Sequence, residues 1–388
     1  MIMQLLNKLH SYGGDLLLFR AALRICKQFA IASCFFIALS ACDQMRPVQT
    51  STAFIHSAPT RALSTSAINE KIAEILLQGI TERKAEGGAT VLVEANTGQI
   101  ISLVSIVTPT APDWEEPKYN RAVHPVHELG SVFKTFTIAQ ALDMALVAPE
   151  TMLTIPPALR ISRFQILDFD QLNEQSTVRE VFLRSSNIGT TQISQLIGSA
   201  AQQSFFGELG LLSAHPLEDR YPTQIKQRLP SNWSSLVAAT LSFGHGLTAS
   251  PLQIAGAYSS LINGGLSVPL STTPLPQFRR RVVNTGTSET LRNLLQANVQ
   301  VGAMSLAAEN ELEVGAYGGT AEMLTASGGY DESRLVSTVA AAFPIENPKY
   351  VLVVMLENPA VRVDGDNLRT ASRTVAPLVA QIIEQVKP

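Results

Sequence analysis

This 388-residue sequence has little cysteine, no excess of basic residues and no long apolar run. All three cysteines, Cys26, Cys34 and Cys42, come before Asp43, so the rest of the chain has neither disulfides nor thiolate metal ligands. Its 29 basic and 32 acidic residues give a net charge of -3, which leaves no surplus to neutralise phosphates. The composition therefore argues against nucleic-acid binding and favours a small molecule or a polymer substrate.

A metal site is also not expected. The six histidines are scattered along the chain, and no Glu/His ligand pattern completes a site. His124 and His127 have the spacing of one helical turn, but Pro125 between them argues against a helix. The sequence predicts neither a metal nor a cofactor.

The N-terminal segment, residues 1–42, predicts export. Its apolar run, residues 29–41, follows basic residues and at 13 residues falls short of the ~20 that span a hydrocarbon core, so it fits a secretory signal. The end of the run, Leu39-Ser40-Ala41-Cys42, resembles the bacterial lipobox, in which the cysteine becomes lipidated. The alternative is an uncleaved anchor helix with an incidental Cys42. Both predict export. If the lipobox resemblance holds, Asp43 directly after the cysteine implies retention at the inner membrane of a Gram-negative cell, with the domain in the periplasm.

The remaining chain divides into a linker and one domain. Residues 43–67 are rich in Ser, Thr, Ala and Pro, which predicts a flexible linker, and residues 68–388 form the folded part. Isoleucines and leucines at helical spacing begin at Ile68 and end before Gly87-Gly88. Two β-rich runs then flank Asn96-Thr97-Gly98, which indicates a hairpin.

The later segments set the fold class. Residues from Gly130 to about Val147 are apolar nearly all round, as in a buried helix. Ser250 and Gln253 have the spacing of a capping box for another helix, which Gly264-Gly265 ends. Strands are expected over 314–324, STVAAAF and YVLVVML, before a helix over about 371–386. Strands at both ends around a helical middle predict an α+β domain, with one antiparallel sheet covered by helices and a helical subdomain.

Three short stretches have the residue types of a serine acyl-transfer site. In the first, Ser131 and Lys134 share one helical face, where flanking Val132, Phe133 and Phe136 would desolvate the amine and lower its pKa toward that of a base. Alone, Ser-x-x-Lys also fits a capping serine before a solvated lysine.

The second and third stretches add polar groups. Ser185 and Asn187 could relay a proton and orient a peptide carbonyl, although Ser-x-Asn alone is also typical of a helix cap. On a predicted strand, Gly318-Gly319-Thr320 would let a substrate backbone approach and offer amide donors for an oxyanion.

Taken in order, the three stretches resemble the S-x-x-K, S-x-N and K-T-G motifs of penicillin-binding protein transpeptidases. The resemblance extends to NRAVHPVHELGSVFKTFTIAQAL, FGHGLTASPLQIAGAYSSLINGG and FPIENPKYVLVVMLENP, and covers roughly residues 86–388. It is nearest to the class B, division-type branch and implies the penicillin-binding protein and serine β-lactamase-like fold. Class B relatives have a further module after the anchor, so partner contacts made through that module are not expected to transfer.

The resemblance implies a role for each residue. Ser131 would attack the D-Ala-D-Ala end of a peptidoglycan stem peptide, Lys134 would take its proton, and Ser185 would pass a proton to the leaving amine. Asn187 would hold the substrate amide, and the backbone amides of Ser131 and Thr320 would form the oxyanion hole. β-Lactams would acylate Ser131, and a cell-wall synthesis complex at the inner membrane is the implied partner.

The third motif departs from the family. In the alignment on Gly319 and Thr320, Tyr317 and Gly318 stand where the family has Lys and Thr, and no lysine lies between Lys226 and Lys349. The lost cation and hydroxyl would have bound the substrate carboxylate and supported the Ser185 relay. Arg334 is a candidate substitute for the cation.

Three hypotheses follow from this departure. The chain is an acyl-transfer enzyme with impaired activity, either a transpeptidase or a carboxypeptidase. Alternatively, it is a non-catalytic homologue that acts as a cell-wall scaffold or ligand-binding protein. The third hypothesis, a β-lactam hydrolase or sensor, fits the segments around the motifs least well.

Overall fold

A computed structural model of the chain describes residues 52–56, 62–113, 118–273, 279–307, 313–325, 329–363 and 366–386. The predicted signal or anchor segment with Cys42, and residues 43–51 of the predicted linker, lie outside this part of the chain. Within it, no helix combines the length and the apolar character needed to cross a bilayer.

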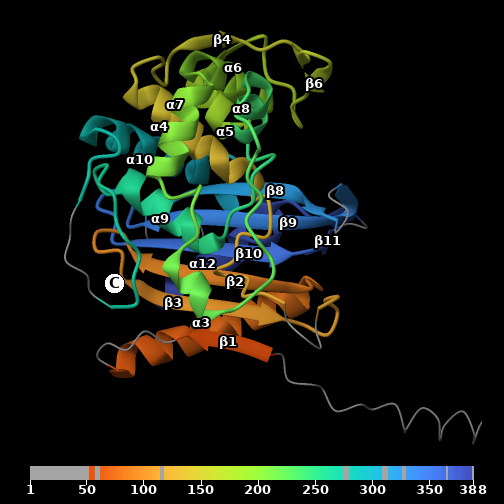
Figure 1. Ribbon diagram of the computed structural model, residues 1–388, viewed down its shortest axis with the longest axis vertical. Coiled ribbons are helices and arrows are strands. Elements are labelled where there is room, and N and C mark those ends of the chain that lie inside the picture. The colour runs from red at the N-terminus through yellow and green to blue at the C-terminus, as the bar shows by residue number, and fades with distance from the viewer. Residues whose placement is uncertain are drawn as a thin grey trace, which may run out of the picture. The chain divides into compact units, whose positions relative to one another are not determined.

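Six antiparallel strands form the central sheet of the unit Ser51–Pro388, as Figure 1 shows. In spatial order they are β1 (Thr52–His56), β3 (Ile100–Val107), β2 (Gly87–Glu94), β10 (Tyr350–Glu357), β9 (Tyr330–Phe343) and β8 (Gly315–Leu324). The predicted hairpin at Asn96-Thr97-Gly98 joins β2 to β3. Strand β8, which contains the third predicted motif, is an edge strand of this sheet.

The apolar runs of the central strands fill two cores. Successive side chains of a strand point to opposite faces of the sheet. In β10, Val351 and Val353 therefore lie in one hydrophobic core, and Leu352 and Val354 lie in the other. An unbroken apolar run such as YVLVVML is thus explained by a strand that is buried on both faces.

Helices cover both faces of the sheet. One face is covered by α3 (Ala62–Glu82) and α12 (Ala376–Val386), with the short elements α11 (Ala371–Thr374) and η4 (Ser305–Ala307) beside them. The other face is covered by α9 (Pro251–Ile262) and α10 (Thr285–Gln300). The predicted capping box of α9 is confirmed, because Ser250 and Gln253 bond reciprocally.

A helical subdomain lies beyond the β8 edge of the sheet in Figure 1. It is built from α4 (Lys134–Asp143), α5 (Val178–Leu183), α6 (Asn187–Ile197), α7 (Ser199–Glu208) and α8 (Ser235–Leu241), with two strand pairs, β4 (Met152–Thr154) with β7 (Gln175–Thr177) and β5 (Leu159–Ile161) with β6 (Phe164–Ile166). A further pair, β11 (Val361–Val363) with β12 (Asp366–Leu368), follows β10 along the chain. The predicted α+β architecture is confirmed.

Two boundary predictions are wrong. The flexible linker expected over 43–67 contains β1 and the start of α3, since β1 pairs with β3 and occupies backbone groups that would otherwise form an open sheet edge. The single helix expected from Gly130 to Val147 begins instead as the 3-10 turn η2 (Gly130–Phe133) and ends at Asp143. The 3-10 turn is what brings Ser131 against β8.

Candidate active site

The turn with Ser131 lies directly against strand β8. Gly130 has a φ of 62°, and a Cβ at this residue would meet the backbone oxygen of Thr320 at 2.7 Å. A Cβ at Gly319 would meet the carbonyl oxygen of Leu129 at 2.2 Å and the amide nitrogen of Ser131 at 2.8 Å. The two backbones therefore approach so closely that neither glycine position has room for a side chain.

Lys134 is a buried amine at the start of α4. Its side chain is 1% exposed, and its Nζ donates hydrogen bonds to Ser185 Oγ at 2.9 Å and to the Ser185 carbonyl oxygen. Burial lowers the pKa of Lys134 to about 7, although the nearby Asp168 carboxylate acts in the opposite direction. Near neutral pH, a large fraction of this amine is therefore unprotonated.

Ser131 lines the same cavity as Lys134. Among the described residues, none forms a hydrogen bond with the Ser131 hydroxyl, and the Lys134 amine is directed to Ser185. Ser131, in η2, and Lys134, at the start of α4, therefore share this cavity, and the Lys134 amine is bonded to Ser185.

Ser185 occupies a strained turn between α5 and α6. Its φ is 54°, in the left-handed region that non-glycine residues seldom adopt. Asp168 holds the following residues, since its carboxylate accepts hydrogen bonds from Ser186 Oγ at 2.7 Å, the Asn187 amide at 2.5 Å and the Ile188 amide at 3.0 Å. A carboxylate at a helix N-terminus is favourable for α6.

Asp168 is a residue that sequence reasoning missed. It precedes Ser186 by 18 positions, and no periodic pattern connects the two residues. The nearest signal is that Asp168 directly follows the short apolar stretch FQIL. Asn187 also contacts this segment, because its side-chain amide donates to the carbonyl oxygen of Leu167 at 3.0 Å.

Tyr317 fills the space between β8 and the Ser185 turn. The side chain is 1% exposed, its ring centroid lies 4.4 Å from that of Phe182, and its hydroxyl donates to the Phe182 carbonyl oxygen at 2.8 Å. Burial raises the pKa of the phenol well above its ordinary value, although a hydrogen bond with the Ser185 side chain acts in the opposite direction. Tyr317 is therefore uncharged across the physiological pH range.

Gly318 and Thr320 face α11 and η4. A Cβ at Gly318 would meet Met304 Cε at 2.7 Å and Ala371 Cβ at 3.3 Å, so the buried Met304 side chain occupies the volume next to this glycine. The Thr320 hydroxyl accepts a hydrogen bond from the Ala371 amide at 2.9 Å. This wall of the site is thus tied to α11.

One cavity of about 600 Å³ brings these groups together. The eight predicted site residues of the folded domain all line it, namely Ser131, Lys134, Ser185, Asn187, Tyr317, Gly318, Gly319 and Thr320. Arg334 does not line it, since this residue is paired with Glu86. The prediction that Arg334 substitutes for the missing cation is therefore wrong.

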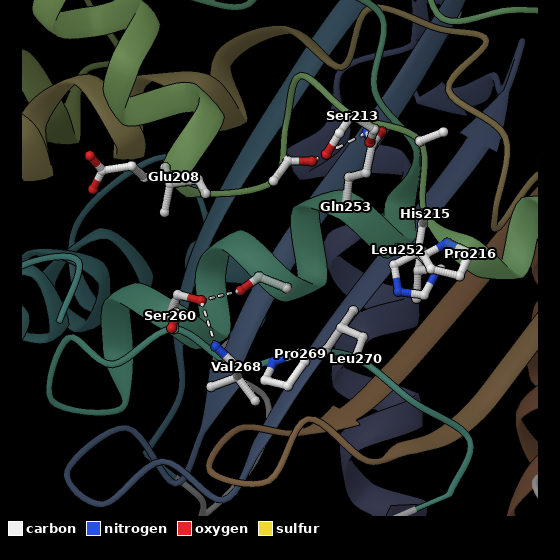
Figure 2. A pocket seen from close by; sticks show the side chains of 15 residues that line it. Glu208, Ser213, His215, Pro216, Leu252, Gln253, Ser260, Val268, Pro269 and Leu270 are labelled. Carbon is white, nitrogen blue, oxygen red and sulfur yellow. Dashed lines mark hydrogen bonds between the residues drawn. The ribbon is translucent and has the colours of Figure 1, made fainter. Parts of the chain in front are cut away.

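A second cavity lies away from this chemistry. It has a volume of about 490 Å³, lies alongside α9 and contains none of the predicted site residues (Figure 2). The Gln253 side chain donates to the Ser213 carbonyl oxygen at 3.0 Å, and Ser260 Oγ donates to that of Gly256 at 2.9 Å. These polar groups stabilise the cavity wall. No cluster of three or more His, Cys, Asp or Glu suited to a metal occurs in the described ranges.

Comparison with known proteins agrees with this geometry. The family model of the penicillin binding protein transpeptidase domain matches residues 88–384. The chain is 28% identical to the probable peptidoglycan D,D-transpeptidase FtsI of Caulobacter vibrioides, over 81% of this chain and 56% of that protein. It is 32% identical to the probable peptidoglycan D,D-transpeptidase PenA of Neisseria flavescens, over 73% of this chain and 72% of that protein.

Solved structures give the same result. The transpeptidase domain of Burkholderia pseudomallei penicillin-binding protein 3 superposes with a TM-score of 0.72 at 27% identity, covering 82% of this chain and 93% of that one. Penicillin-binding protein 3 of Mycobacterium tuberculosis, complexed with aztreonam, has a TM-score of 0.72 at 25% identity over 82% of this chain and 76% of that one.

The fold and the comparisons define a transpeptidase-type domain. This chain belongs to the penicillin-binding protein transpeptidase family, which confirms the predicted resemblance. It spans 56% of the Caulobacter protein, and about half (49%) of the peptidoglycan D,D-transpeptidase FtsI of Escherichia coli, to which it is 29% identical.

The buried lysine predicts a pH-dependent stability. Because its folded pKa is about 7 and its ordinary value is 10.5, the unfolded state binds more protons between these pH values, and stability rises with pH across this window. We therefore expect the free energy of unfolding of Lys134→Met to exceed that of wild type most below pH 7. Above pH 7 this difference shrinks by up to about 1.4 kcal/mol per pH unit. Urea unfolding at several pH values measures this. The exposed Lys71→Met variant is the control, and a pH-independent difference for Lys134→Met would contradict the prediction.

The close contact between β8 and the Ser131 turn predicts that a side chain at Gly319 destabilises the fold. Gly319→Ala forces two backbones apart and is expected to lower the free energy of unfolding by about 1 to 3 kcal/mol. Gly207→Ala is the matched control, since only Leu212 Cδ1, at 3.9 Å, lies near its Cβ position on α7. The control should be neutral or slightly stabilising. Denaturant unfolding compares them, and equal stability of Gly319→Ala and wild type would contradict the close approach.

Proposed function

We propose that this chain is a serine D,D-acyltransferase that acts on the D-Ala-D-Ala end of peptidoglycan stem peptides in cell wall synthesis. The observation that carries the proposal is the hydrogen bond from the buried Lys134 amine to Ser185 in the cavity that also contains Ser131. A nucleophile, a base with a pKa near 7 and a proton relay are thereby within one site.

The reaction proceeds through an acyl-enzyme. Ser131 Oγ forms a bond with the carbonyl carbon of the penultimate D-Ala and transfers its proton to the neutral Lys134 amine. The bond to the terminal D-Ala nitrogen then breaks, and the proton reaches this leaving amine through Ser185. An amine of a neighbouring stem peptide, or water, attacks the ester and restores Ser131.

Backbone amides stabilise the charge that develops. The amides of Ser131 and Thr320 are the proposed oxyanion donors, and the close packing of Gly319 on the Ser131 amide supports this assignment, because it fixes strand and turn at one distance. Asn187, at the start of α6, is proposed to hold the substrate amide.

Tyr317 is proposed to lower the rate of this reaction. It stands where the family motif has lysine, and its phenol is neutral, buried and bonded to the Phe182 carbonyl. A neutral donor cannot replace the electrostatic support of a cation for the Ser185 relay, and a positioned proton-transfer partner is worth about 100 to 10,000-fold in rate. Activity is therefore expected below that of family members with lysine here.

A non-catalytic binding role is the alternative, and Met304 favours it. Its side chain occupies the volume beside Gly318, where the family motif has a threonine hydroxyl. The enzyme proposal is preferred because Lys134 keeps the burial and the lowered pKa of a base, an arrangement that costs stability and has no use in a scaffold.

Export and attachment to the inner membrane are part of the proposal. The lipobox-like Leu39-Ser40-Ala41-Cys42 supports lipidation at Cys42, and an uncleaved anchor remains the alternative. The domain would then act in the periplasm, with stem peptides, β-lactams and a cell-wall synthesis complex as partners. The complexes of Mycobacterium tuberculosis penicillin-binding protein 3 with aztreonam and ampicillin support β-lactam binding by the shared fold.

Fluorescent penicillin tests the acyl-enzyme step. Wild type is expected to become labelled slowly, at a rate that rises with pH through about 7 as Lys134 loses its proton. Ser131→Ala should take up no label, whereas Ser213→Ala, a substitution in the second cavity, should behave as wild type. Unlabelled wild type, or equal label on Ser131→Ala, would overturn the enzyme proposal.

Restoring the motif tests the reason for the low rate. Tyr317→Lys with Gly318→Thr needs Met304→Ala as well, because the threonine side chain would otherwise meet Met304. The triple variant is expected to be acylated about 100-fold faster than Met304→Ala alone. Tyr317→Phe, which only removes the phenol hydroxyl, should change the rate little and cost about 1 kcal/mol of stability. A triple variant no faster than Met304→Ala would show that the missing cation and hydroxyl are not the limiting defect.

A further inference from the structure

The substrate of the proposed reaction ends in a carboxylate, and β8 offers it no cation. A buried or semi-enclosed carboxylate needs a charged hydrogen-bond donor, and Arg is the residue whose planar guanidinium matches it in two parallel bonds. Among the described residues that line the active-site cavity, two side chains have a permanent positive charge, Arg184 and Arg373.

The other cations near the site are occupied. Lys134 is bonded to Ser185, and its pKa of about 7 leaves it only partly charged near neutral pH. His245, which also lines the cavity, lies 3.6 Å from Glu128. Neither of these groups provides a free permanent charge for a ligand carboxylate.

Arg373 is on the correct wall of the cavity. It belongs to the last turn of α11, the element whose Ala371 amide donates to the Thr320 hydroxyl at 2.9 Å. The same Ala371 contacts the Cβ position of Gly318. Helix α11 therefore adjoins both Gly318 and Thr320 of β8. Arg373 is exposed, and it forms no ion pair with any other described residue.

Arg184 is on the other wall. It caps the C-terminal end of α5 and directly precedes Ser185, on the side of the cavity where the relay and Asn187 lie. A carboxylate bound there would compete with the leaving amine for the space beside Ser185. Arg373, and not Arg184, therefore has the position that a terminal carboxylate along β8 requires.

We propose that Arg373 binds the terminal carboxylate of the ligand and replaces, from α11, the cation that β8 lacks. The inference rests on the proposed function for the identity of the ligand. It predicts that the protein distinguishes a D-Ala-D-Ala carboxylate from the corresponding C-terminal amide, because loss of a hydrogen bond to a charged group weakens binding by about tenfold or more.

Equilibrium binding to the full-length Ser131→Ala protein tests this, since no turnover interferes. The ligands are diacetyl-L-Lys-D-Ala-D-Ala and its C-terminal amide, compared by calorimetry. The Ser131→Ala background is expected to prefer the carboxylate about tenfold, and Arg373→Gln should abolish this preference without changing the affinity for the amide. Arg179→Gln removes an equal charge from an exposed position on α5 outside the cavity and should keep the preference.

Each other outcome overturns the inference. Arg373→Gln with an unchanged preference would assign the carboxylate to another group, and an equal loss of affinity for both ligands would indicate a steric role. Absence of binding by either ligand would also refute it. Arg373→Lys, which keeps the charge without the two-pronged donor, should retain part of the preference. Failure of the proposed enzyme function is separate, because it appears as an absence of penicillin label on wild type.

Discussion

The close approach of strand β8 to the Ser131 turn is the constraint on which the site depends. Gly319 lies with its Cβ position 2.8 Å from the Ser131 amide, so strand and turn cannot move independently. The sheet register fixes β8 through its pairing with β9, and η2 fixes the turn through α4. The geometry of the proposed substrate site is therefore set by two packed backbones.

In the proposed alignment with the family motif, Tyr317 in place of a lysine changes the charge beside this contact. Tyr317 is large and buried, and it packs its ring on Phe182 and donates a hydrogen bond to the Phe182 carbonyl oxygen. The protein core gains an aromatic contact where the family motif has a cation. The proposed proton route then relies on Lys134. Burial lowers the pKa of this amine, and the Asp168 carboxylate raises it in part.

Much of this could be predicted from local sequence. Turn, cap and periodicity signals located the β2–β3 hairpin and α9, and short motifs located the lining of one cavity. What could not be predicted depends on contacts between distant segments. Pairing of β1 with β3, the Asp168 anchor of α6 and the Met304 side chain beside Gly318 have no local signature. Arg334 was a wrong choice because Glu86, 248 residues away, binds it.

The lysine of the family motif would serve two steps, binding of the substrate carboxylate and support of the Ser185 relay. A cation placed on α11 instead affects these two steps unequally. A cation on α11 can attract a carboxylate as well as one on β8, because binding requires only charge and donor geometry. It cannot support the Ser185 relay from the exposed rim, and a guanidinium does not release a proton at physiological pH. In the proposed mechanism, the defect therefore falls on protonation of the leaving amine. Ligand recognition and attack by Ser131 are the steps that we propose this site retains most fully.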